Sequence, residues 1–141
     1  MLTLLTLLGL FACQESTTSI DARCEITTEV PGETWNVGNT ETLQAFPMTD
    51  RIDTLVTIND IPLSVLDIDK SSCAECEECK NTAGCTDCNY CPECTNECDE
   101  CIHVLTVEVP TDLPIRDEYW LSIHNTLGSS TPILIDIQES N

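Results

Sequence analysis

Nine cysteines lie within 29 residues, from Cys73 to Cys101, and no other side chains of the chain promise as much chemistry. They are spaced C-x2-C-x2-C-x5-C-x2-C-x2-C-x2-C-x3-C-x2-C. Eight carboxylates and one lysine, Lys80, accompany them, with almost no apolar side chains. Because such a segment cannot bury enough carbon surface to fold, it must be held together by disulfides or by bound metal.

The N-terminus indicates in which cellular compartment these cysteines are found. Residues 1–12 are mostly apolar and carry no charged side chain, and they are fewer than the roughly 20 residues that a membrane-spanning helix needs. This pattern predicts a secretory signal peptide. Its end, Leu10-Phe11-Ala12-Cys13, resembles the lipobox of bacterial lipoproteins. The resemblance implies that Cys13 is acylated after cleavage, and polar residues 13–23 then form a lipidated tether. An ordinary signal peptide cut nearby is the alternative.

Disulfide bonding is the preferred interpretation of the other cysteines, because exported thiols tend to oxidise. The chain has eleven cysteines, so ten remain once Cys13 is assigned to lipid, and ten is an even number. Nine cannot all pair among themselves, so Cys24 is predicted to pair with one of them. Neighbours within a C-x2-C unit are expected to have more distant partners, and the connectivity stays open. The predicted disulfide residues are Cys24, Cys73, Cys76, Cys79, Cys85, Cys88, Cys91, Cys94, Cys98 and Cys101.

Metal binding or redox activity is the alternative interpretation. Cys88, Cys91, Cys94 and Cys98 have the spacing of a [4Fe–4S] run, and pairs of C-x2-C units can also hold zinc. The run lacks the proline that follows the fourth cysteine, and repeated three-residue spacing produces such matches easily. The preferred interpretation therefore includes no cofactor and no metal.

Composition argues against two classes of function. The net charge of −20 comes from 25 acids and five bases, which argues against nucleic acid as a partner, since phosphate binding needs clustered lysine and arginine, and favours cations or basic partners. The two histidines, His103 and His124, fall on predicted strands, and no hydrolase, zincin or phosphate-loop motif occurs. We therefore predict that the protein is not an enzyme.

The elements that would carry the cysteines are strands. Short runs with polar and apolar alternation are separated by turn signals, and none shows a helical period. In the clearest run, 102–109, Leu105, Val107 and Val109 are expected to face the core. The other predicted strands are 25–30, 42–46, 53–58, 63–68, 119–124 and 133–137, with a turn at 125–130. About seven strands favour an all-β fold, an antiparallel β-sandwich.

Two stretches also resemble a known family. Leu105-Thr106-Val107-Glu108-Val109-Pro110 and the spacing Y-x-L-x-I-x-N-x-x-G-x-S from Tyr119 to Ser130 resemble the IPT/TIG family of immunoglobulin-like domains. The resemblance implies an immunoglobulin-like sandwich over residues 24–141, with the cysteine-rich acidic segment 70–101 inserted between two adjacent strands.

Together these expectations describe a non-catalytic cell-envelope lipoprotein. It would be anchored by lipid at the outer membrane or cell surface and would present a disulfide-stapled acidic loop. The family resemblance implies binding, adhesion or a structural role, with a protein or glycan partner at the cell surface. The alternative is a zinc, iron–sulfur or redox-active cysteine module.

Overall fold

The computed structural model describes residues 24–85 and 91–140. The predicted signal peptide, the tether with Cys13, and Cys88 lie outside the described residues. The strands are β1 (Cys24–Glu29), β2 (Thr34–Asn36), β3 (Thr40–Phe46), β4 (Leu55–Ile58), β5 (Ile61–Asp69), β6 (Val104–Glu108), β7 (Arg116–His124), β8 (Gly128–Ser130) and β9 (Ile133–Gln138). Between β5 and β6 lie η1 (Ser71–Cys73), α1 (Ala74–Ala83), η2 (Pro92–Cys94) and α2 (Thr95–Cys98). No helix in the described part of the chain is long and apolar enough to cross a membrane.

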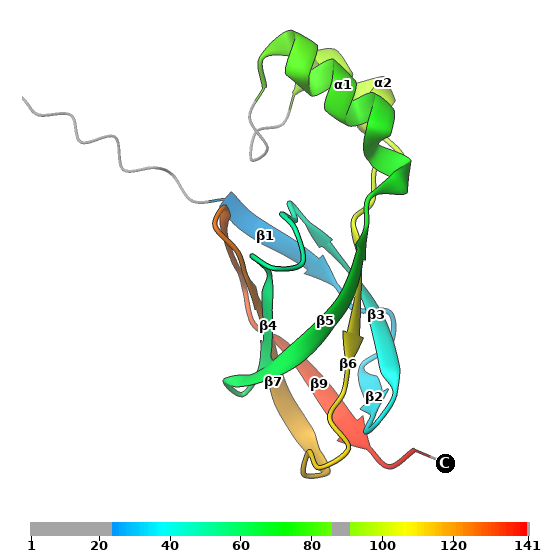
Figure 1. Cartoon of the computed structure of the whole chain (residues 1–141), viewed down its shortest axis with the longest axis vertical. Coiled ribbons are helices and arrows are strands. Elements are labelled where there is room, and N and C mark those ends of the chain that lie inside the picture. Colours follow the sequence, from blue (N-terminus) through cyan, green and yellow to red (C-terminus); the bar gives the residue numbers. More distant parts are fainter. Residues whose placement is uncertain (1–23, 86–90, 141) are drawn as a thin grey trace, which may run out of the picture.

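Seven strands close into a barrel, and the predicted immunoglobulin-like sandwich is therefore wrong. The hydrogen-bonded order is β7-β4-β5-β6-β3-β1-β8, and β8 pairs again with β7 to complete the ring. Two further strands extend the wall, since β9 pairs with β7 and β2 pairs with β9. Figure 1 shows the strands surrounding one interior, with the helices projecting beyond one end of the barrel. A sandwich would instead consist of two sheets that share no hydrogen-bonded strand.

The ring closes because two strands change partner halfway along their length. In β1, Cys24–Ile26 runs parallel to β8, whereas Thr27–Glu29 runs antiparallel to β3. In β5, Ile61–Leu63 pairs with β4 and Ser64–Asp69 pairs with β6. The register shifts between Val65 and Asp67, where a β-bulge bends the strand. Polar and apolar alternation predicts which face of a strand is buried, but it carries no information about a change of neighbour.

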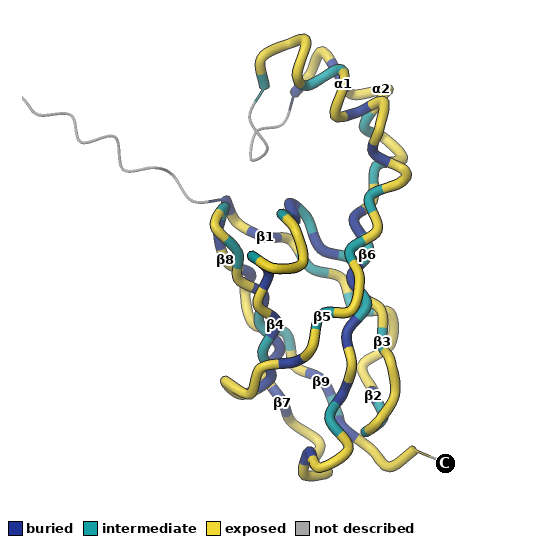
Figure 2. Tube along the Cα trace, in the orientation of Figure 1, coloured by how far each residue is buried: buried dark blue, intermediate teal, exposed yellow. Residues whose placement is uncertain are grey.

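The barrel interior is built from the alternating apolar residues. Leu105, Val107 and Val109 are fully buried, which confirms their predicted orientation. The predicted strands are all found, whereas β2 and β8, with three residues each, were missed because three residues show no alternation. Trp35 on β2 is also fully buried, and its indole Nε1 has no hydrogen-bond partner among the described residues. In Figure 2 buried positions alternate along the barrel strands, and exposed positions dominate the helices.

Gly128 is the position at which the closing strands come closest. A Cβ atom on residue 128 would overlap the carbonyl oxygen of Cys24, which belongs to the backbone and cannot rotate away. A hydrogen bond beside this contact holds the strands together, because the N–H of Cys24 donates to the carbonyl of Leu127 at 2.7 Å. Closure between β1 and β8 therefore requires glycine at this position.

A carboxylate secures the turn next to this closure. Asp53 Oδ2 accepts hydrogen bonds from the backbone N–H of Thr126 at 3.0 Å and from its hydroxyl at 2.7 Å. Asn125 Nδ2 donates to the carbonyl of Pro47 at 3.1 Å, so the loop before β4 has two ties to the turn before β8. These donors favour the charged carboxylate, and the pKa of Asp53 is lowered, first by the Thr126 N–H and then by the hydroxyls of Thr49 and Thr126.

Asp53→Asn is expected to weaken the fold at neutral pH and to flatten its response to acid. Because the folded pKa lies below the unfolded value of about 3.9, the carboxylate stabilises the fold above about pH 4, and this contribution is lost as the pH falls through the folded pKa. Denaturant unfolding of wild type and variant at a series of pH values measures the effect. Asp112→Asn is the control, because Asp112 is exposed and accepts no hydrogen bond from the described residues. Parallel pH profiles for Asp53→Asn and wild type would contradict the assignment.

Candidate functional site

The segment between β5 and β6 forms a helical hairpin, here taken as residues 70–85 and 91–103. Four disulfides staple it: Cys73–Cys101, Cys76–Cys98, Cys79–Cys94 and Cys85–Cys91. The bridges are nested, so each encloses the next, from the base at the barrel to the tip. The prediction of a disulfide-bonded, cysteine-rich segment is confirmed for these eight residues. None of the bridges joins neighbours within a C-x2-C unit, as expected.

The cysteine spacing itself explains the helix, although the sequence analysis predicted none. Residues three apart lie on one face of a helix, so Cys73, Cys76 and Cys79 face the returning chain. The ends of α1 also agree with helix electrostatics, with two glutamates in its first turn. Gly84 ends the helix at φ 72° and donates its N–H to the carbonyl of Lys80. The helical period was missed because cysteines, and not aliphatic side chains, carry it.

Sulfur takes the place of a hydrocarbon core in the hairpin. In its helical segments η1, α1, η2 and α2 the only buried side chains are Cys73, Cys76 and Cys94, and Cys91, just before η2, is buried as well. The contiguous apolar core lies in the barrel and includes no residue of the hairpin. The hairpin therefore depends on its covalent bridges for its shape, as the composition of the segment indicated.

Cys24, at the start of β1, is disulfide-bonded as well. Its partner is none of the eight hairpin cysteines described above, because they pair with one another. Two cysteines remain in the sequence, Cys13 and Cys88. We predict that Cys88 is the partner, which would agree with the expectation that Cys24 pairs with the insertion.

Peptide mapping of the unreduced protein tests this pairing. We expect one cross-linked species that joins the peptide containing Cys24 to the peptide containing Cys88, and that separates on reduction. The four hairpin bridges supply the internal control, since they should appear in the same digest. A species that joins Cys24 to Cys13 would contradict the prediction and would also remove Cys13 as a lipidation site.

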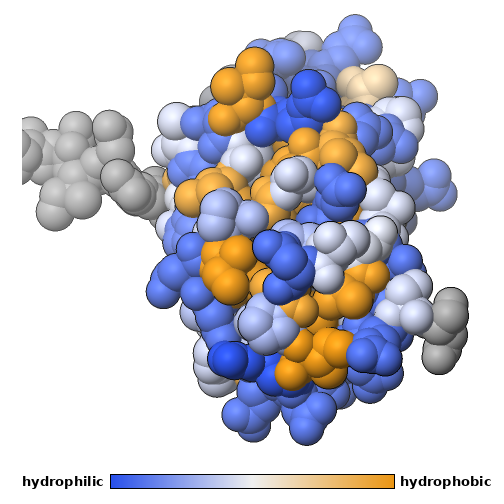
Figure 3. Space-filling model, turned by 60° about the horizontal axis from the view of Figure 1, so that its bottom comes forward, coloured by the Kyte–Doolittle hydropathy of each residue, from blue (hydrophilic) through white to orange (hydrophobic). Residues whose placement is uncertain are grey.

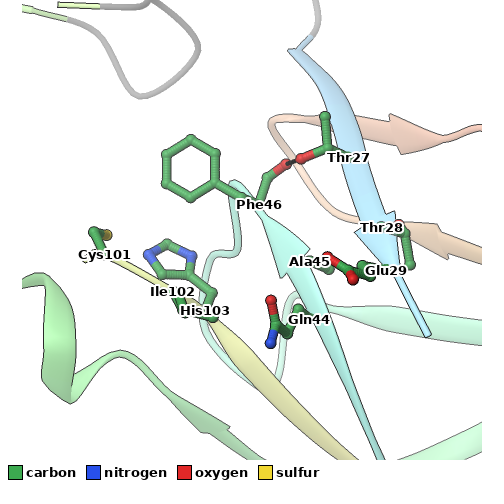
Figure 4. Close-up of a pocket in the computed structure, with 9 residues that line it drawn as sticks. All are labelled: Thr27, Thr28, Glu29, Gln44, Ala45, Phe46, Cys101, Ile102 and His103. Carbon is green, nitrogen blue, oxygen red and sulfur yellow. Dashed lines mark hydrogen bonds between the residues drawn. The ribbon is translucent and has the colours of Figure 1, made fainter. Parts of the chain in front are cut away.

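The base of the hairpin contacts the barrel through His103 and its neighbours. His103 is only 5% exposed, and its Nδ1 accepts a hydrogen bond from the N–H of Met48 at 3.1 Å. Its ring centroid lies 4.9 Å from that of Phe46. Figure 4 shows this ring between Phe46 and Cys101, at a pocket of about 280 Å³ where the hairpin joins the barrel. His103 is therefore a packing residue of the junction as well as the first residue before β6.

Both lysines of the hairpin are directed toward the barrel. Lys70 Nζ donates to the carbonyl of Met48 at 2.5 Å. Lys80 Nζ lies 5.1 Å from the ring centroid of Phe46, within range of a cation–π interaction. A second pocket, of about 290 Å³, lies between these side chains and His103. Lys80 stands out in the sequence as the lone cation among the acids between the cysteines, but nothing in the sequence indicates its contact with Phe46.

The opposite face of α1 carries only acidic charge. A shallow depression of about 520 Å³ there is lined by Glu75, Glu78 and Glu97, together with Cys79, Thr82 and Ala83. The three glutamates come from the two antiparallel segments that the disulfides join. Because the lysines point away, nothing of opposite charge from the described hairpin neutralises this surface.

The proposed iron–sulfur ligands do not come together as a set. Cys91, Cys94 and Cys98 are bonded to three different partners, and Cys88 lies outside the described residues. A different group has metal-ligand geometry: the sulfurs of Cys73 and Cys101 and a ring nitrogen of His103 lie within 4.8 Å of one another. Those two sulfurs form a disulfide, so they become available as ligands only after reduction.

Fold and site together define a small disulfide-rich protein: a closed β-barrel with a stapled acidic hairpin at one end. No protein-family model and no curated protein matches the chain. The resemblance to the IPT/TIG family is therefore supported only by the residues that suggested it, and the barrel departs from the sandwich it implied.

Proposed function

We propose that the protein is a non-catalytic binding module of the cell envelope, and that its hairpin binds a basic segment of a partner protein. The observation that carries this proposal is the face formed by Glu75, Glu78 and Glu97, held in place by disulfides with both hairpin lysines turned away. This is the acidic loop of the sequence analysis, now with a defined surface.

Covalent stapling supports a recognition role because it lowers the cost of binding. A flexible acidic loop would lose conformational freedom when it bound its partner, and this loss would weaken the complex. The bridge Cys76–Cys98 joins the first turn of α1 to the last residue of α2, and Cys79–Cys94 lies beside the depression. The carboxylates are therefore presented by a preorganised scaffold.

Charge supports a basic partner. The field of a molecule with net charge −20 repels anionic surfaces and accelerates the approach of cationic ones. A segment rich in lysine or arginine would gain charge-assisted hydrogen bonds from the three glutamates.

The cell envelope is the compartment that suits the disulfides, because such bridges persist in oxidising surroundings. The sequence before Cys24 agrees with export, and acylation of Cys13 would supply the anchor. Adhesion through the hairpin and a structural role in the envelope both fit this location.

A charge-matched pair of variants tests the site. Glu75→Gln/Glu78→Gln/Glu97→Gln removes three carboxylates from the hairpin face and changes the net charge from −20 to −17. Glu25→Gln/Glu33→Gln/Glu118→Gln makes the same change at three exposed residues of the barrel. The probe is a lysine-rich peptide, titrated by calorimetry at near-physiological salt, where diffuse attraction is largely screened.

We expect the hairpin variant to bind about tenfold more weakly than wild type, and the barrel variant to bind nearly as well as wild type, because contact charges count more than distant ones. Circular dichroism of both variants confirms that they are folded. Equal weakening in the two variants would show a general charge effect and would refute the hairpin site.

A second candidate function has one observation in its favour, the clustering of Cys73, Cys101 and His103. A dithiol reductant would donate two electrons and two protons to the Cys73–Cys101 disulfide, giving two thiols and an oxidised reductant. The thiolates and the imidazole could then bind Zn²⁺ as three of its four ligands. This function is supported if the reduced wild type binds zinc while the oxidised protein and the reduced His103→Ala variant do not. Equal zinc binding by the reduced wild type and the reduced His103→Ala variant would dismiss it.

A further inference from the structure

Trp120 lies on the outer wall of the barrel with 54% of its surface exposed. The other tryptophan, Trp35, is fully buried, so the fold has interior room for one indole but leaves the second outside. Tryptophan is enriched at contact surfaces, because its large ring is apolar while its N–H can still find a polar partner. On the face of the molecule drawn in Figure 3, apolar side chains gather in patches between polar ones.

The strand register aligns a set of side chains around Trp120. On β7, Trp120, Ser122 and His124 alternate with buried residues and therefore share the outer face. Leu134 of β9 is the direct neighbour of Trp120. Thr57 of β4 is the direct neighbour of Ser122 on the other side. Three strands thus contribute to one continuous surface.

A tight turn holds Trp120 in place. Asn59 Oδ1 accepts a hydrogen bond from the backbone N–H of Trp120 at 2.8 Å, and the N–H of Asn59 donates to the Trp120 carbonyl at 2.9 Å. Asn59 and Asp60 both have positive φ, 46° and 66°, as in the two-residue hairpin turns that favour these residues. The backbone under the exposed indole is therefore fixed before any ligand arrives.

Polar groups of several kinds surround the indole. A shallow depression of about 430 Å³ beside it is lined by Thr57, Asn59, Asp60, Trp120, Ser122, His124 and Pro132. The set offers a carboxylate acceptor, two hydroxyls and an imidazole. His124 Nδ1 is hydrogen-bonded to Ser129 Oγ at 2.9 Å, which orients the ring and leaves Nε2 without a hydrogen bond to any described residue. The volume lies within the range of small-molecule sites.

We infer that this surface binds a neutral glycan through one or two hexopyranose rings. One face of a pyranose ring presents C–H groups that can lie flat on an indole, while its equatorial hydroxyls point outward as donors and acceptors. Trp120 supplies the flat apolar platform, and Asp60, Ser122 and His124 supply hydrogen-bonding groups at its edge. Few other ligands combine an apolar face with a rim of hydroxyls.

Charge selects among the possible occupants. At −20 per chain, a second copy of the protein, an anionic polysaccharide and an anionic lipid surface are all repelled. A neutral glycan meets no such penalty, and its hydroxyls can donate to the carboxylate of Asp60. This site is on the barrel wall and uses no residue of the hairpin, so the inference stands independently of the proposed hairpin function.

The experiment measures binding of the oxidised protein to neutral polysaccharides by affinity electrophoresis. Native gels are cast with glucans of different linkage, mannan, galactomannan or glycol chitin. We expect at least one of them to retard wild type, and Trp120→Ala to lose at least about tenfold in affinity, as expected when the main aromatic contact is removed. Trp120→Phe keeps an aromatic face and should retain part of the affinity.

Two control variants test whether glycan binding is specific to the surface around Trp120. Ile52→Ala removes an apolar side chain that is 94% exposed on a different loop, and it should migrate like wild type. The Glu75→Gln/Glu78→Gln/Glu97→Gln variant should keep glycan binding, which separates this site from the hairpin. Failure of the whole panel to retard wild type, or equal retardation of wild type and Trp120→Ala, would overturn the inference.

Discussion

Reduction of the folded protein is expected to unfold the hairpin while the barrel stays folded. With ten residues, α1 is shorter than the roughly 12–15 residues at which isolated helices become marginally stable in water. Its helical partners bury only cysteine side chains. Each disulfide of this kind contributes about 2–4 kcal/mol, although nested bridges do not add fully. The barrel core contains no hairpin residue and so keeps its own apolar packing.

Two signals separate the two parts in one titration with reductant. The helical signal in far-UV circular dichroism reports α1, and the emission of Trp35, fully buried in the barrel, reports the core. The Trp120→Phe variant leaves Trp35 as the single emitting indole. We expect the helical signal to disappear with little change in Trp35 emission. A concerted loss of both signals would show that the barrel depends on the bridges.

Gly128→Ala is expected to open the barrel between β1 and β8. The added methyl group would overlap the Cys24 carbonyl, and backbone atoms cannot yield as a flexible side chain does. Overpacking of this kind costs about 1–3 kcal/mol, and we expect the upper end because the displaced contact is also the one that closes the ring. Loss of amide-exchange protection should appear first at Ile26, whose strand pairs with β8.

Gly32→Ala is the matched control for this substitution. Gly32 differs from Gly128 in having a positive φ, 84°, and a Cβ there would meet no described atom within 4 Å. Its cost is the conformational penalty alone, about 1 kcal/mol. If the two variants unfold at the same denaturant concentration, the close approach of β1 and β8 does not limit stability.

The sequence predicted the strands well and their arrangement poorly. The inward orientation of Leu105, Val107 and Val109 follows from alternation, which depends only on local geometry. The closed ring depends on β1 and β5 each pairing with two neighbours, and it depends on one glycine contact between residues 24 and 128. No local pattern records such long-range pairings, and the immunoglobulin-like sandwich was the wrong result.

For the candidate site too, the sequence predicted the local character of the segment but not its spatial arrangement. The acidic, disulfide-rich nature of residues 73–101 was evident from composition, because apolar side chains are almost absent there. The direction of the lysine side chains was not evident from the sequence, because Lys80 contacts Phe46 only when the hairpin lies against the barrel. Sequence alone does not tell the two tryptophans apart, and only the position of Trp120 on the outer face of β7 distinguishes it from the buried Trp35.

The nested bridges have a consequence for how the protein oxidises during synthesis. The sequence separations of the four hairpin bridges are 6, 15, 22 and 28 residues from tip to base. As the chain emerges from its N-terminus, Cys91 is the first of the eight to appear whose partner is already present. Cys94, Cys98 and Cys101 then each find the most recently made unpaired thiol of this set. Each bond shortens the loop that the next bond must close, which lowers the entropic cost of closing that loop. The native bridges are therefore the ones that form when each new cysteine pairs with the nearest unpaired cysteine before it in this set.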